Sequence, residues 1–189
     1  MKIYRSPWRT VNACFVLGVC AILLGAFAVQ FGAREIPCPL CLLQRLALLG
    51  VGTGAMLNVV FGVRPRYYGV SLVSAIFGGI VAGRQVLLHI APGTGSYGSP
   101  FLGLHLYTWS FIAFVGTGIV LSAMLLLDSQ FAHPLERPKR LPTSRLARTA
   151  VASFVVIAAA NLAVTLLLCG LGPCPADPTG YQWLSWLGE

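Results

Sequence analysis

Long apolar runs separated by short polar stretches dominate the chain. Each run is close to the ~20 apolar residues that an α-helix needs to cross a bilayer. The runs are continuously apolar and do not alternate with a period of two, which favours helices over the strands of a membrane barrel. Five spans are predicted, at residues 11–31, 42–63, 68–90, 106–127 and about 149–168. The expected fold is an all-α integral membrane protein, with one domain over residues 1–189: a four-helix bundle core plus a fifth, C-terminal transmembrane helix.

The composition excludes a soluble domain. Hydrophobic residues make up 57% of the chain, charged residues only 10%, and the mean hydropathy is +0.79. A soluble domain carries about 25% charged residues. The net charge of +8 does not indicate a nucleic-acid partner, because the 13 basic residues lie between apolar runs and not among polar ones. The expected surroundings are therefore a lipid bilayer.

The basic residues also predict an orientation. Most of them precede the first span or lie between spans two and three or spans four and five, whereas residues 91–105 and the tail after Leu168 contain no Lys or Arg. By the positive-inside rule the N-terminus is cytoplasmic and the C-terminus periplasmic. The basic start and the residues 26–28 also resemble a cleavable signal peptide, but the run from Val11 is longer than the about 7–15 residues of its apolar region.

The six cysteines fall into two groups. Cys14 and Cys20 lie in the first span, where free cysteines pack as small apolar residues. The other four lie at the outer membrane face, in two close pairs: Cys38 with Cys41, and Cys169 with Cys174. Two close pairs on the oxidising side of a membrane suit thiol–disulfide exchange.

The first pair carries the sharper signal. The two-residue spacer holds both sulfurs within bonding reach, and Pro37 and Pro39 restrict the backbone around Cys38. Cys41 immediately precedes the second span, so its sulfur is expected beside unpaired helical N–H groups. Arg45 follows one turn later and is costly to bury in a membrane. Both features favour the thiolate, the reactive form of cysteine.

Other interpretations of these residues stay open. The first pair is also compatible with a structural disulfide, with Arg45 reaching the lipid head groups. The four outer cysteines together are also compatible with a zinc site. Arg84 and Gln85 lie near the outer end of the third span with His89 beyond them, where polar groups can line a pocket.

Residues 37–45, Pro-Cys-Pro-Leu-Cys-Leu-Leu-Gln-Arg, resemble the Pro-Cys-x-x-Cys-x-x-x-Arg signature of the disulfide bond formation protein B family. Members of this family are quinone-reducing thiol oxidases of bacterial inner membranes. Residues 83–86 and 103–109 resemble weaker motifs of the family, and the resemblance covers about residues 8–128.

The resemblance implies a function. Cys38 and Cys41 pass two electrons to a membrane quinone, ubiquinone or menaquinone, beside Arg45. His89 lies near the position of a histidine that the family links to the quinone site. The implied protein partner is a periplasmic thioredoxin-fold dithiol oxidase, which the family reoxidises.

The chain departs from the family in its second cysteine pair. Family members carry this pair in a long outer loop between spans three and four, but residues 91–105 contain no cysteine. We expect Cys169 and Cys174 to replace it as the partner-facing disulfide, although a structural disulfide is an alternative. Two alternative functions remain: a quinone or epoxide reductase of similar four-helix architecture, with reversed electron flow, and a membrane metal-binding protein that uses the outer cysteines.

Overall fold

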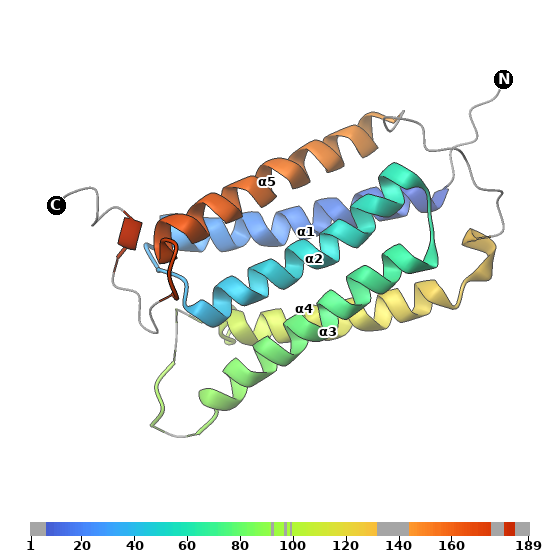
Figure 1. Cartoon of the computed structure of the whole chain (residues 1–189). Coiled ribbons are helices and arrows are strands. Elements are labelled where there is room, and N and C mark those ends of the chain that lie inside the picture. The colour runs from blue at the N-terminus through green and yellow to red at the C-terminus, as the bar shows by residue number, and fades with distance from the viewer. Residues whose placement is uncertain are drawn as a thin grey trace.

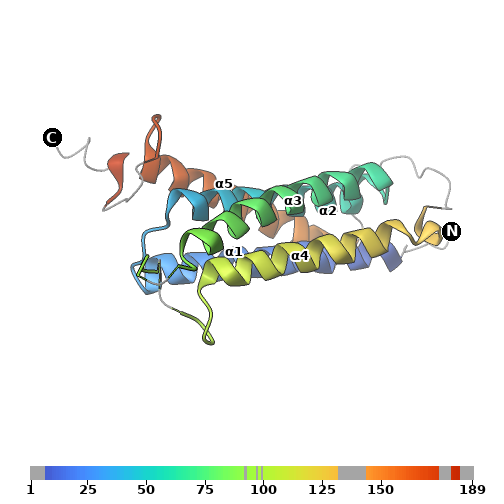
Figure 2. The same cartoon turned by 90° about the horizontal axis from the view of Figure 1, so that it is seen from below.

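A computed structural model describes residues 7–91, 93–96, 98, 100–131, 144–174 and 180–183. Five α-helices run along a common long axis (Figures 1 and 2), and each is long and apolar enough to cross a membrane. A short 3₁₀ helix follows the fourth. The helices are α1 (Pro7–Gly32), α2 (Pro39–Phe61), α3 (Pro65–Leu88), α4 (Leu106–Leu125) and α5 (Arg145–Cys169). The all-α membrane fold predicted from the sequence is confirmed.

Proline sets the starts of α2 and α3. The apolar runs suggested starts at residues 42 and 68, but the helices begin three residues earlier, at Pro39 and Pro65. Proline fits the first helical turn, because the N–H that it lacks has no helical partner there and its φ is already helical. Gly62 ends α2 with a φ of 90°, a conformation that side-chain-bearing residues rarely adopt.

Helices α1 to α4 pack against one another in chain order, and α5 packs against α1 and α2. α1 packs on α2, α2 on α3 and α3 on α4, while α5 contacts α1 and α2. Figure 1 shows α5 and α4 on opposite sides of the molecule. A Cβ atom at Gly52 of α2 would overlap the ring of Phe154 of α5. A glycine at this position therefore lets α5 approach α2 closely, as small residues do in membrane bundles.

Buried polar side chains join three helices at the end of the bundle that holds the N-terminus. Asn12 Nδ2 donates to Tyr68 Oη at 2.8 Å, and Asn58 Nδ2 donates to Asn12 Oδ1 at 3.1 Å. Asn58 Oδ1 accepts the backbone N–H of Arg64 at 2.9 Å. Hydrogen bonds between membrane helices contribute about 1–2 kcal/mol each in model peptides. These bonds fix α1, α2 and α3 relative to one another.

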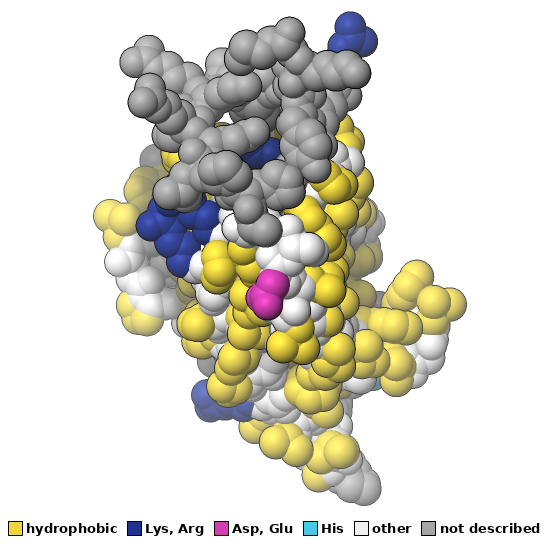
Figure 3. All heavy atoms as spheres, turned by 90° about the vertical axis from the view of Figure 1, so that its right-hand side faces the viewer, with side chains coloured by type: hydrophobic (Ala, Val, Ile, Leu, Met, Phe, Trp, Pro, Cys, Tyr) yellow, Lys and Arg dark blue, Asp and Glu magenta, His cyan; other side chains and the backbone are white. Residues whose placement is uncertain are grey.

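The two ends of the bundle differ in charge and chemistry. Figure 3 looks onto the end of the bundle where α1 begins, and both basic and acidic side chains face the viewer there. The described basic residues at this end are Arg9, Arg64, Arg66, Arg145 and Arg148. The start of α2 and the end of α5, with their cysteines, lie at the other end of the bundle (Figure 1).

Candidate active site

The first cysteine pair lies at the N-terminal end of α2. Cys38 is the N-cap residue, with extended backbone angles, and Pro39 follows it in the first turn. The backbone N–H of Cys41 donates to Cys38 Sγ at 3.2 Å. Both thiols are free; Cys38 is buried and Cys41 is half-buried.

The structure places Cys38, and not Cys41, at the start of the helix. Cys41 was expected just before the helix, but the helix already begins at Pro39, so the Cys38 sulfur occupies the capping position. The interaction with the Cys41 side chain, and then burial, raises the pKa of the Cys38 thiol. Cys41, which lines a cavity at this end of the bundle, is the candidate for the sulfur that reacts there.

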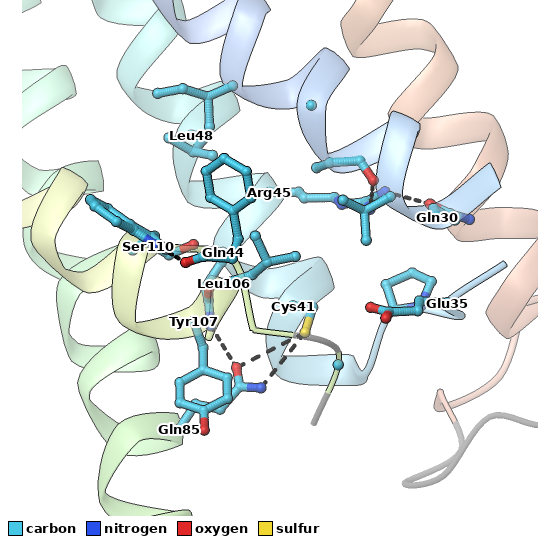
Figure 4. A pocket seen from close by; sticks show the side chains of 18 of the residues that line it. Gln30, Glu35, Cys41, Gln44, Arg45, Leu48, Gln85, Leu106, Tyr107 and Ser110 are labelled. Carbon is cyan, nitrogen blue, oxygen red and sulfur yellow. Dashed lines mark hydrogen bonds between the residues drawn. The ribbon is translucent and has the colours of Figure 1, made fainter. Parts of the chain in front are cut away.

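Cys41 lines a cavity of about 560 Å³ between α1, α2 and α4, with Gln85 of α3 also in its wall. The two connections at this end of the bundle, through Glu35 and Phe101, also contribute to its wall. Most of the lining side chains are apolar, and Tyr107 and Trp109 add aromatic rings. Figure 4 shows Cys41 and Arg45 on the same side of this cavity. Its volume lies within the roughly 300–1,000 Å³ of small-molecule sites.

Arg45 lies one helical turn beyond Cys41, and it is 9% exposed. Its Nη1 donates to Gln30 Oε1 at 2.7 Å, and its Nη2 donates to the carbonyl oxygen of Ala26 at 3.0 Å. Its guanidinium also lies over the ring of Phe27, 5.3 Å from the centroid. All three partners belong to α1 and are uncharged. They hold the guanidinium in place, so its positive charge lies at the cavity that Cys41 also lines.

Gln85 of α3 approaches both sulfurs of the pair. Its Nε2 lies 3.4 Å from Cys38 Sγ and 3.7 Å from Cys41 Sγ, and the residue is 1% exposed. Its Oε1 accepts a hydrogen bond from Gln44 Nε2 at 2.7 Å (Figure 4). Gln85 Oε1 also accepts from the Cys41 thiol, with 4.0 Å between the oxygen and the sulfur, while the NH₂ group lies near both sulfurs. Donors in this position stabilise a thiolate through charge-assisted hydrogen bonds.

His89 contacts Tyr107, one of the residues that line the cavity. Its ring stacks on Tyr107 with 5.2 Å between centroids, and His105 stacks on the same ring at 5.3 Å. Its Nδ1 lies 2.8 Å from the carbonyl oxygen of Gln85, which accepts the hydrogen bond. Tyr107 lines the cavity, whereas His89 is not among the described residues that do so. The structure therefore connects His89 to the cavity through Tyr107.

The second outer pair is a disulfide at the end of α5. Cys169, the last residue of the helix, is bonded to Cys174, with 4.5 Å between their Cα atoms. Gly170, with a φ of 62°, ends the helix between them. Cys169 is 6% exposed and Cys174 is half-buried, so Cys174 is the more accessible of the two.

Three polar residues near the site were not expected from the sequence: Gln30, Gln44 and Tyr181. Gln30 had a usable signal, since a polar side chain inside an apolar span is a functional hint. Gln44 had a weaker signal, its place directly before Arg45 in the sequence. Tyr181 had no comparable signal, because it lies in a tail without helical periodicity.

Comparison with known proteins connects this site to one family. The family model described as "Disulfide bond formation protein DsbB" matches residues 8–97. A protein named "Disulfide bond formation protein B" from Xanthomonas axonopodis pv. citri is 31% identical over 155 residues, which cover 60% of this chain and 90% of the relative. The chain belongs to the disulfide bond formation protein B family. The resemblance noted in the sequence is thereby confirmed.

Two further relatives of the same name match different extents. The Cupriavidus metallidurans protein is 36% identical over 73 residues, which cover 38% of this chain and 45% of the relative. The Saccharophagus degradans protein is 26% identical over 153 residues, which cover 61% and 92%. No solved structure matches the chain. The residues matched by the family model include Cys38, Cys41 and Arg45 but not Cys169 or Cys174.

Proposed function

We propose that this protein is a membrane dithiol:quinone oxidoreductase, which reoxidises a periplasmic thioredoxin-fold dithiol oxidase and so supports disulfide bond formation. One observation carries the proposal. The Cys41 thiol, paired with Cys38, lines a mostly apolar cavity beside the buried guanidinium of Arg45. Membership of the disulfide bond formation protein B family supports the same chemistry.

The cavity suits a quinone head group, ubiquinone or menaquinone. A quinone is a flat, mostly apolar ring with two carbonyl oxygens, and the cavity offers apolar and aromatic walls with few polar groups. Tyr107 and Trp109 would contact the ring, and Arg45 would donate to an oxygen. A bound quinone supplies an acceptor for two electrons and two protons.

The chain's own residues carry out the oxidation of the pair. Cys38 and Cys41 lose two electrons and two protons as the S–S bond between them forms. Cys41 faces the cavity and is the electron-donating sulfur, while Cys38 lies behind it. The charge of Arg45 and the NH₂ group of Gln85 stabilise negative charge on Cys41 before the bond forms.

The disulfide at the end of α5 is the entry point for electrons. A thiolate of the reduced partner attacks one sulfur of Cys169–Cys174, which breaks that bond and leaves the partner oxidised after the second exchange. The resulting dithiol then reduces the Cys38–Cys41 disulfide by the same chemistry. Both pairs lie at one end of the bundle (Figure 1), as this sequence of exchanges requires.

We infer a location in the bacterial inner membrane with the cysteine end in the periplasm. The opposite end carries five described arginines, as the cytoplasmic end of an inner-membrane protein does. The periplasm is an oxidising compartment, in which disulfides persist. The lipid-facing sides of the bundle are apolar.

The test of this function is the direction of electron flow in the purified protein. With dithiothreitol as the donor, we expect a short-chain ubiquinone to be reduced to quinol, measured by its loss of ultraviolet absorbance. The reductase alternative instead predicts that quinol is consumed and a disulfide substrate is reduced. The metal-binding alternative has less support, since Cys169 and Cys174 share a disulfide and are not thiolate ligands in this structure.

Replacing Arg45 with methionine should reduce the rate of quinone reduction about 100-fold, the effect of removing one electrostatic donor from a catalytic site. Methionine keeps an unbranched, flexible side chain, although a shorter one, and loses the charge. Arg45→Lys should rescue activity in part at most, because lysine offers a point charge without the planar fork that bonds Gln30 and Ala26 together. Steady-state rates at saturating dithiothreitol measure both variants. An unchanged rate and quinone affinity in Arg45→Met would remove Arg45 from the site.

Replacing Gln85 with methionine should slow quinone reduction about tenfold, the loss that follows from one charge-assisted hydrogen bond. Alkylation of Cys41 by iodoacetamide should slow as well at neutral pH, because less of the thiol is ionised. Gln130→Met is the matched control, since Gln130 lies beyond the opposite end of α4 and bonds the backbone of Met124. Equal alkylation rates in wild type and Gln85→Met would show that Gln85 only fills space.

A further inference from the structure

We propose that Tyr181, in the C-terminal tail, supports the quinone site from outside the cavity. Tyr181 is a positioning residue that holds Gln30, and through Gln30 it holds Arg45. The inference rests on the proposed function. Tyr181 lies beyond the residues that the family model matches, in the same part of the chain as the Cys169–Cys174 disulfide.

A chain of hydrogen bonds runs from the tail to the arginine. Gln30 Nε2 donates to Tyr181 Oη at 3.2 Å, and Gln30 Oε1 accepts from Arg45 Nη1 at 2.7 Å. Both ends of the Gln30 amide are therefore occupied. Figure 4 shows Gln30 and Arg45 joined beside the cavity that Cys41 lines.

The amide needs its second contact because of burial and side-chain entropy. Gln30 is 3% exposed, and a buried NH₂ group without an acceptor costs free energy. A glutamine side chain also has several rotatable bonds, whose freedom is lost when it is held in one rotamer. The phenol oxygen of Tyr181 fixes the nitrogen end of the amide, so the oxygen end stays directed at Arg45.

Two other features bring the tail to this position. α5 packs on α1 and α2, with Phe154 seated at Gly52. The tail then leaves α5 through the Cys169–Cys174 disulfide, seven residues before Tyr181. Tyr181 is half-buried in the structure and contacts α1, which lies beside α5. Tyr181 therefore reaches the site of the first cysteine pair indirectly, through Gln30 of α1.

The test is Tyr181→Phe in the full-length protein, which removes one oxygen and keeps the ring. With dithiothreitol as the donor, no protein partner is needed and only the quinone step is measured. We expect the KM for a short-chain ubiquinone to rise about 3- to 10-fold, as for the loss of one hydrogen bond, with kcat changed less than about twofold. Tyr67→Phe is the matched control, because its hydroxyl bonds the exposed Arg66 at the opposite end of the bundle.

A double-mutant cycle separates positioning from simple packing of the tail. Gln30→Met should raise the quinone KM, and adding Tyr181→Phe to it should change the KM less than about twofold, because Tyr181 acts through Gln30. Full multiplication of the two effects, or an unchanged KM in Tyr181→Phe alone, overturns the inference while wild-type turnover still supports the proposed function. Failure of the wild-type protein to reduce quinone contradicts the function and, with it, the inference.

Discussion

Cys41→Ser protein should lose quinone reduction, with a rate at least about 1,000-fold below wild type, as expected when a covalent catalytic group is removed. A serine hydroxyl cannot form a bond with the Cys38 sulfur, so the pair can no longer release two electrons. The loss should be the same with dithiothreitol and with a reduced thioredoxin-fold partner as the donor. Quinol formation in the purified protein, followed by ultraviolet absorbance, measures it.

The chain offers a matched control for this substitution. Cys14 is an exposed free cysteine on α1, toward the opposite end of the helix from Gln30. Cys14→Ser should therefore retain wild-type turnover. Near-normal quinone reduction in Cys41→Ser would rule out the first pair as the electron donor.

Replacing both Cys169 and Cys174 with serine should abolish oxidation of the protein partner and preserve quinone reduction by dithiothreitol. Exchange with a folded partner needs an accessible disulfide, whereas a small dithiol can reach the half-buried Cys41 directly. We expect partner oxidation to fall at least about 100-fold, because the partner's thiolate no longer has an accessible disulfide to attack. Thiol quantification of the partner and quinol formation measure the two activities in parallel.

Single substitutions identify the sulfur that the partner attacks. Cys174 is more accessible than the buried Cys169, so Cys169→Ser protein, which keeps Cys174, should trap the partner as a mixed disulfide. Non-reducing electrophoresis detects this adduct. A purely structural disulfide predicts instead that the double variant oxidises its partner at a near-normal rate and that neither single variant traps it.

Much of the fold follows from local sequence. The length and continuity of the apolar runs predict the five helices, because each span needs enough apolar residues to cross the bilayer. The Cys38–Cys41 spacing and Arg45 one turn later predict a redox-active pair beside a charge, since Cys41 and Arg45 are four residues apart and share a face of any helix. The boundary of α2 was placed three residues late, because apolar periodicity does not register a proline at the first helical position.

The contacts between helices did not follow from the sequence. Gln85 reaches the sulfurs from α3, and Gln30 reaches Arg45 from α1. Both contacts depend on how each helix is rotated about its axis and how closely it packs, which no local pattern specifies. The contact of Tyr181 with Gln30 depends further on where α5 docks, so it required the structure.

His89 illustrates the same limit. Its place near the outer end of the third span and the family resemblance suggest a role near a cofactor, and the structure stacks it against Tyr107, which lines the cavity. The sequence gives the depth of a residue in the membrane but not which neighbouring ring it faces.

The most direct test of the central claim is a single turnover of the reduced protein without oxygen. One equivalent of quinone is added to the Cys169→Ser/Cys174→Ser double variant, in which Cys38 and Cys41 are the outer thiols that remain. The account predicts one quinol for each chain and, by mass spectrometry of alkylated peptides, a disulfide between Cys38 and Cys41. Unreduced quinone with both thiols still alkylated, or quinol without that disulfide, would contradict it.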